Sequence, residues 1–140
     1  MGDDGVGIYV VRMLKDMIRA GTDVEFKELS VGGLRLVEEM LGYDRVIMID
    51  SMSSNDVKPG RIREFRSEQF KETLQVSSPH VTNFATALEL YKKLEPDAIP
   101  RTIRIFTIDI KPEFIFGEGL SPPVQEAASK LVDQIVREIK

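Results

Sequence analysis

The chain has 140 residues, of which 42% are hydrophobic and 30% charged, as expected for one globular domain. A formal net charge of −4 argues against a general nucleic-acid binder, and the absence of cysteine excludes disulfides, zinc–thiolate sites and thiol nucleophiles. No apolar run approaches the roughly 18 residues that span a bilayer, and no signal peptide is visible, so we expect a cytoplasmic protein with no membrane partner.

Helices and strands alternate along the chain. In chain order we expect a helix at 5–20, a strand at 24–29, a short helix at 34–41, a strand at 45–50, an outer strand at 61–65, a short helix at 67–74, a longer helix after 79–80, a strand at 102–110 and a helix that starts at 121–122. The unbroken apolar run Val46–Ile49 is typical of a strand covered on both faces in a parallel sheet. The alternation predicts an α/β fold, a three-layer sandwich with a mostly parallel twisted sheet between helices, in a single domain of residues 1–140.

Four residues stand at positions where this architecture binds ligands. Asp50 ends a predicted strand, and ligands bind beyond the carboxyl ends of the strands in open α/β sheets. His80, the only histidine, stands where a loop enters a helix. Asp3 and Asp4 open the first helix. Each also has a purely structural interpretation, because aspartates at strand ends and helix starts commonly cap the backbone.

Asp4, Asp50 and His80 together would offer two carboxylates and an imidazole to one metal ion. That donor set suits a divalent ion such as nickel or zinc, with positions left open for a second molecule. A phosphate-binding loop is a weaker interpretation of the glycines, since two negative charges stand where a phosphate would sit. A serine hydrolase has little support, because no Gly-x-Ser-x-Gly motif occurs.

Four stretches of the chain resemble the nickel–iron hydrogenase maturation endopeptidases, in the order of that family. They are GDDGVGIYVV, VIMIDSMSSNDVKPG, SSPHVTNFATAL and GEGLSPPVQEA. The resemblance implies a twisted sheet between helices and an enzyme that removes a C-terminal peptide from the hydrogenase large-subunit precursor after nickel insertion. It also implies that Asp4, Asp50 and His80 are the metal-contacting and catalytic residues, and that they complete the coordination of a nickel ion supplied by the substrate.

The sequence departs from the family pattern at two places. The family's first strand should precede Gly2 and is missing, so we expect the domain to be N-terminally truncated relative to the family. We therefore expect a rearranged N-terminus or a homo-oligomer formed by strand exchange. The loop Ser30–Gly33 lacks a Gly-Thr pair that many members carry, which leaves the identity of the hydrogenase partner open.

Two other functions stay open at this point. The first is a non-catalytic binding protein that retained the fold and lost activity with the first strand. The second is a nucleotide-binding module, which nucleotide titration would test.

Overall fold

The computed structural model describes residues 5–18, 23–29, 33–52, 58–66, 79–111 and 119–139. The chain forms two compact units, one of residues 1–28, 49–63 and 107–140, the other of residues 29–48 and 64–106. The predicted helix at 67–74 lies outside the described residues. Among the described residues, no helix is both long and apolar enough to cross a membrane.

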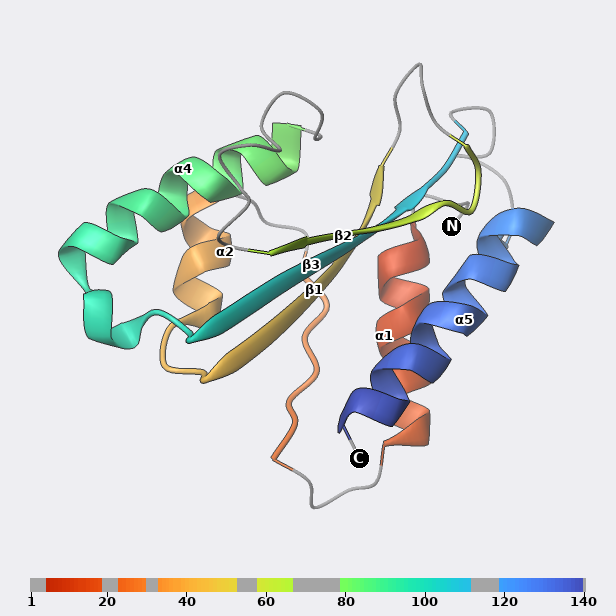
Figure 1. The fold of residues 1–140 in the computed structure, drawn as a ribbon, viewed down its shortest axis with the longest axis horizontal. Helices are drawn as coiled ribbons and strands as arrows, with labels where there is room; N and C mark the ends of the chain where they lie inside the picture. Colours follow the sequence, from red (N-terminus) through yellow and green to blue (C-terminus); the bar gives the residue numbers. More distant parts are fainter. Residues whose placement is uncertain are drawn as a thin grey trace. The chain divides into compact units, whose positions relative to one another are not determined.

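In the first unit, helices α1 (Val6–Met17) and α5 (Pro122–Ile139) pack against each other (Figure 1). The helical spacing of apolar residues explains this contact, because it places them on one stripe of each helix. Buried along the stripes are Val6, Val10 and Leu14 of α1, and Val124, Ala128, Leu131 and Ile135 of α5. Both predicted helices are confirmed, although Met17 is exposed rather than part of the buried stripe.

In the second unit, helices α2 (Gly33–Met40) and α4 (Pro79–Leu94) pack against each other, and a short 3₁₀ helix, η3 (Pro96–Ala98), follows α4. Phe84 and Leu88 of α4 are buried, as the apolar spacing predicts. The Tyr91 hydroxyl donates a hydrogen bond of 3.0 Å to Glu38, which links the two helices at their exposed side and raises the pKa of Tyr91.

The described strands form a sheet in the order β1-β3-β2, with β1 at Arg45–Met52, β2 at Ile62–Arg66 and β3 at Thr102–Asp109 (Figure 1). Strands β1 and β3 are parallel, because the amides of Thr102 and Ile110 donate to the carbonyls of Asp44 and Met52 in the same chain direction. Strand β2 runs antiparallel to β3. The two strands are joined where the Asp109 amide donates to the Arg61 carbonyl and the Gly60 amide donates to the Asp109 carbonyl. The described sheet thus has one parallel and one antiparallel pairing, which is consistent with the predicted α/β fold.

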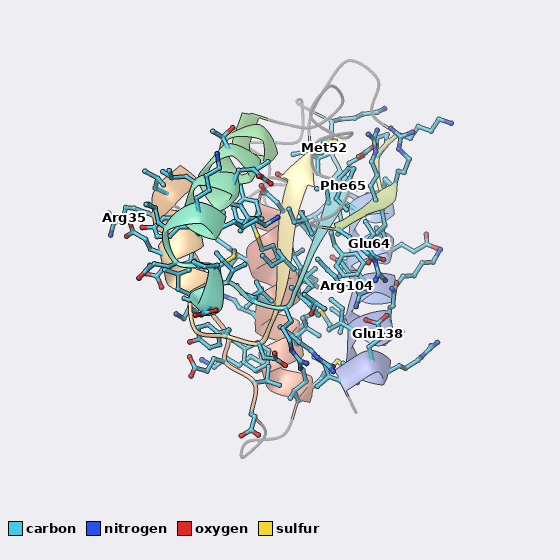
Figure 2. The ribbon with its side chains drawn as sticks, turned by 60° about the vertical axis from the view of Figure 1, so that its left-hand side comes forward. Arg35, Met52, Glu64, Phe65, Arg104 and Glu138 are labelled. Atoms are coloured by element: carbon cyan, nitrogen blue, oxygen red, sulfur yellow. The ribbon has the colours of Figure 1, made fainter. Side chains whose placement is uncertain are left out.

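Strand β3, between its two neighbours, is buried along most of its length. On one face of β3 the Arg104 guanidinium donates to Glu64 of β2 at 2.8 Å (Figure 2). The same guanidinium lies over the Phe106 ring. Strand β1, at the edge of the described sheet, is half-buried from residue 46 to residue 51. The apolar run in β1 therefore does not mark a fully covered strand.

The strand predicted at residues 24–29 is wrong. This segment has no regular secondary structure, although Val24 and Phe26 are half-buried and their neighbours exposed, as in a strand with one covered face. Alternation of polar and apolar residues indicates which side chains face the core. A strand also needs a neighbouring strand that pairs with its backbone N–H and C=O groups. The expectation of a missing first strand upstream stays a prediction.

Candidate functional site

Asp50 is the one predicted site residue whose side chain the structure describes. It lies in β1, which continues two residues beyond it to Met52, so Asp50 does not end the strand as expected. The Asp50 carboxylate is half-buried, and its Oδ1 accepts the backbone N–H of Ser51 at 2.8 Å. The aspartate thus makes the local backbone contact that its structural interpretation predicts.

The other two predicted residues cannot be placed beside Asp50. Asp4 lies outside the described residues, and His80 lies in the first turn of α4 with its side chain outside the described part. Among the residues that the structure describes, no three His, Cys, Asp or Glu side chains gather closely enough to hold a metal ion. The convergence of Asp4, Asp50 and His80 stays a prediction.

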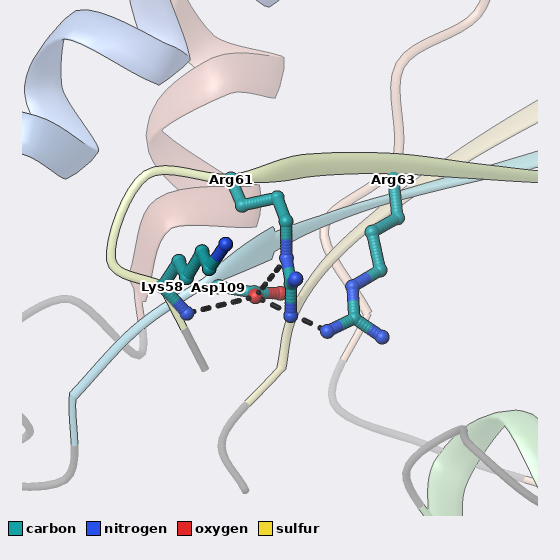
Figure 3. Close-up of polar contacts among 4 residues, drawn as sticks. All are labelled: Lys58, Arg61, Arg63 and Asp109. Atoms are coloured by element: carbon teal, nitrogen blue, oxygen red, sulfur yellow. Dashed lines mark hydrogen bonds and ion pairs between the residues drawn. The ribbon is translucent and has the colours of Figure 1, made fainter. Parts of the chain in front are cut away.

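A second carboxylate, which the sequence analysis did not single out, organises a charged cluster. Asp109, the last residue of β3, is fully buried, and its Oδ2 accepts hydrogen bonds from three groups (Figure 3). The donors are Arg61 Nε at 2.8 Å, Arg63 Nη2 at 3.3 Å and the backbone N–H of Lys58 at 3.2 Å. We call these four residues the Asp109 cluster.

The turn before β2 positions the Asp109 cluster. Proline followed by glycine favours a type II turn, in which the glycine takes a positive φ. Gly60 has a φ of 86°, and the amide of Arg61 donates to the carbonyl of Lys58 at 2.8 Å. A Cβ on Gly60 would lie 2.5 Å from the carbonyl oxygen of Pro123, so only glycine fits between this turn and α5. The turn brings Arg61 opposite Asp109, whose amide donates to the Arg61 carbonyl at 2.9 Å.

The register of the strands places Asp50 on the same face as the cluster. The bond from the Ile110 amide to the Met52 carbonyl sets Asp50 beside Thr107, since β1 and β3 are parallel. The pairing of Arg61 with Asp109 sets Arg63 beside the same Thr107, because side chains two residues apart share a face of a strand. Asp50, Thr107 and Arg63 therefore form one row across β1, β3 and β2.

Two buried oxygens in this region, Thr107 Oγ1 and Asp109 Oδ1, have no hydrogen-bond partner among the residues that the structure describes. Buried polar groups are nearly always paired in folded proteins, so two unpaired oxygens on neighbouring positions of one face mark a candidate functional region. The sequence did hold a signal for Asp109. It follows an apolar strand in the same way as Asp50, and the rule that selected Asp50 would also have selected Asp109.

Comparison with known proteins identifies the family. Residues 8–138 match the family model of the hydrogenase maturation proteases. The chain belongs to this family.

The chain is also similar to a curated protein and to solved structures. The protein is 31% identical over 143 residues to Protein FrxA of Pyrococcus furiosus, an alignment that covers 99% of this chain and 98% of that protein. Among solved structures, it is similar to the hydrogenase maturating endopeptidase HybD of E. coli, with a TM-score of 0.77, 21% identity, and coverage of 99% of this chain and 84% of that one. It is also similar to the [NiFe] hydrogenase maturation protease HybD of Thermococcus kodakarensis, with a TM-score of 0.69, 27% identity, and coverage of 100% and 92%. The predicted α/β fold and the family resemblance are both confirmed.

Proposed function

We propose that this protein is an endopeptidase that removes the C-terminal extension of a nickel–iron hydrogenase large-subunit precursor once nickel has been inserted. The observation that carries the proposal is the family match, which spans residues 8–138 and includes Asp50 and His80. The half-buried Asp50 carboxylate near the carboxyl end of β1 adds support, because ligands of open α/β sheets bind at that edge.

The reaction is a peptide hydrolysis without redox chemistry. The oxygen of a water molecule forms a bond to the carbonyl carbon, the C–N bond breaks, and the leaving nitrogen takes up a proton. In this proposal Asp4, Asp50 and His80 contact a nickel ion that arrives with the substrate, and a metal so placed polarises a carbonyl or lowers the pKa of a bound water. A carboxylate of this set accepts the proton of the attacking water.

The first experiment tests the predicted site residues. We expect Asp50→Asn and His80→Ala to abolish cleavage of the nickel-loaded precursor, with only a small change in the midpoint of thermal unfolding. Asp133→Asn, at an exposed position of α5, is the matched control and should cleave normally. Full cleavage by both site variants would refute the site. Absence of cleavage by the unmodified protein would favour the non-catalytic binding protein.

The second experiment tests the role of nickel. The proposed ligands are few, so they need groups of the substrate to complete the coordination of the ion. We expect cleavage of the nickel-loaded precursor and no cleavage of the same precursor prepared without nickel. Equal cleavage of the two precursors would show that the enzyme does not recognise its substrate through the metal.

A further inference from the structure

We propose that Gly7 is a positioning residue of the endopeptidase site, which holds the start of helix α1, and with it Asp4, against the backbone of β1 at Asp50. This inference rests on the proposed endopeptidase function. It concerns a residue without a functional side chain, and it assigns to that residue the placement of one proposed nickel ligand relative to another.

The first turn of α1 contacts the backbone of β1 through Gly7. A Cβ atom on Gly7 would lie 2.5 Å from the carbonyl oxygen of Ile49, 3.2 Å from its carbonyl carbon and 3.6 Å from the Cα of Asp50. Because a carbon–carbon single bond is about 1.5 Å long, the Cα atoms of Gly7 and Asp50 lie no more than about 5 Å apart. Gly7 therefore brings the start of the helix directly against the strand position that carries a proposed ligand.

The position of Asp4 depends on the same turn, because one peptide bond joins Asp4 to Gly5. Gly5 is buried and stands directly before the first residue of α1. Consecutive Cα atoms are about 3.8 Å apart across a trans peptide bond. A displacement of Gly7 displaces the turn that includes Gly5, and it therefore moves the point at which Asp4 is attached.

Both backbones at this contact are held in place by other interactions. Strand β1 is bonded to β3, where the Ile110 amide donates to the Met52 carbonyl at 2.9 Å. Helix α1 packs against α5, and its residues Val6 and Val10 are fully buried. The separation between the helix and the strand is thus set by the absence of a Cβ atom at Gly7.

The size of the displacement decides its effect on a metal site. Non-bonded carbon and oxygen atoms ordinarily lie about 3.5 Å apart, so a Cβ that would stand at 2.5 Å requires a shift of roughly 1 Å. Ligand distances in metal sites hold to within about 0.2 Å. A misplacement of about 1 Å can lower the rate of an enzyme by roughly 100-fold. With alanine in place of Gly7, Asp4 and Asp50 would therefore no longer meet the same ion.

The kinetic test compares Gly7→Ala, Val10→Ala and Gly42→Ala in cleavage of the nickel-loaded precursor. Val10→Ala destabilises the same helix by a cavity and causes no clash at its start. Gly42→Ala places alanine at a glycine of the second unit that has a φ of 88° and open space around it. We expect Gly7→Ala to lower kcat/KM by about 100-fold and both controls to stay within about threefold of the unmodified enzyme, at a temperature where all variants are folded. Equal kcat/KM values for Gly7→Ala and Val10→Ala would overturn the inference.

A binding test uses nickel ions alone, which are titrated into the protein while its amide signals are followed by NMR. Nickel held by oxygen and nitrogen ligands is paramagnetic and broadens the signals of nearby nuclei. In the unmodified protein we expect the signals of Gly5, Gly7 and Ser51 to broaden together and that of Gly42 to stay sharp. Broadening of Ser51 without Gly5 and Gly7, or broadening of none of them, would overturn the inference, and neither result depends on the folding of a variant.

A double variant shows whether Gly7 acts through Asp4. We expect Gly7→Ala and Asp4→Asn each to weaken nickel binding by about tenfold or more, and the double variant to bind no more weakly than either single variant, because residues that act as one unit are not additive. Effects that multiply in the double variant would contradict a role through Asp4.

The two readouts separate this inference from the proposed function. If no precursor is cleaved but Gly7→Ala and Asp4→Asn weaken nickel binding equally, the proposed function fails and the positioning role of Gly7 stands. If the precursor is cleaved and Gly7→Ala cleaves it and binds nickel as Val10→Ala does, the inference fails and the function stands.

Discussion

Two polar residues on one face of β3 are buried at a cost to the stability of the protein. Thr107 and Asp109 are two positions apart and both are buried, and within the described part of the chain each has an oxygen without a hydrogen-bond partner. Each unpaired buried polar group costs about 1–3 kcal/mol relative to the same group in water. An apolar residue at position 107 would therefore suit the core better, whereas Asp109 also pairs with Arg61 and Arg63 through its Oδ2.

Replacement of Thr107 by valine tests whether its hydroxyl is unpaired in the folded protein. Valine fills a similar volume without the oxygen, so we expect the free energy of unfolding to stay the same or to rise by about 1 kcal/mol. Urea denaturation measures this change, and Thr102→Val at the exposed start of β3 is the control. A loss of more than about 1 kcal/mol would mean that the hydroxyl has a partner.

Replacement of Asp109 by asparagine should lower the free energy of unfolding. The change removes the negative charge that faces Arg61 and Arg63, and a buried ion pair that loses one member typically costs about 3–5 kcal/mol. Because 33% of the Arg61 side chain and 19% of the Arg63 side chain are exposed, we expect a smaller loss, roughly 2–4 kcal/mol in urea denaturation. Unchanged stability would show that the cluster contributes nothing to the fold.

Some residues of the candidate site can be predicted from the sequence and others cannot. Asp50 is predicted as a site residue because it follows an apolar run; it lies half-buried in β1, and its role in the site stays a prediction. The contacts of Asp109 with Arg61 and Arg63 could not be predicted, since they depend on the register between β2 and β3. That register comes from long-range hydrogen bonds and leaves no local pattern in the sequence.

At the scale of elements, close approach of backbones fixes where helix α1 begins. A Cβ on Gly7 would lie 2.5 Å from the carbonyl oxygen of Ile49 in β1, so the first turn of α1 touches the strand next to Asp50. A phosphate-binding loop is the weaker interpretation that the sequence allows for the glycines around the start of this helix. The structure assigns to Gly7 a packing role, since no larger residue fits against the backbone of β1.

Replacement of Gly7 by alanine should displace the start of α1. Both clashing atoms belong to backbone, so the helix must shift, and overpacking of this kind typically costs about 1–3 kcal/mol. Gly42→Ala is the control, because Gly42 has a φ of 88° but open space around it, and only backbone strain of about 1 kcal/mol is expected there. Thermal unfolding compares the two, and equal losses would contradict the close approach.

An ion pair between Asp44, in the connection from α2 to β1, and Arg101, just before β3, predicts a pH dependence of the stability. The Arg101 guanidinium donates to both oxygens of the exposed Asp44 carboxylate, and this lowers the pKa of Asp44 below its ordinary value of 3.8. A carboxyl group with a lowered pKa in the folded state stabilises the protein above its unfolded pKa, and this contribution disappears as pH falls through the folded value. We expect Asp44→Asn to be slightly less stable than the unmodified protein at pH 6, and equally stable near pH 2, in urea titrations. A constant difference between the two pH values would rule out the ion pair as the cause.

The predicted elements succeed where local signals suffice and fail where a partner is required. Helices α1, α4 and α5 follow from apolar spacing and from their start signals, such as Pro122 after Ser121. The segment 24–29 has the alternation of a strand but no ladder, because pairing depends on residues far away in the chain. The antiparallel direction of β2 could not be predicted either, since the local sequence indicates a strand but not the strand with which it pairs.

At the scale of the whole molecule, the two edges of the described sheet differ in how they are protected. Exposed strand edges are templates for pairing with other chains, and proteins commonly protect them with short length, charges or proline. Strand β2 is short and carries Arg63, Glu64 and Arg66. Strand β1 has eight residues, and its central apolar run Val46–Ile49 is half-buried and contains neither lysine nor proline.

We therefore expect this protein to self-associate through the edge of β1. Pairing of β1 with an extended segment of a second copy would satisfy its outer backbone groups and cover the half-buried apolar run, as in strand-exchanged assemblies. Sedimentation velocity over a wide range of protein concentrations should show a dimer or larger homo-oligomer that dissociates on dilution. Hydrogen exchange of the β1 amides should be slow in the oligomer and faster at low concentration, while exchange of the β3 amides, which are paired on both sides, should change little. A single monomeric species at every concentration, with slowly exchanging β1 amides, would mean that another segment of the same chain covers this edge.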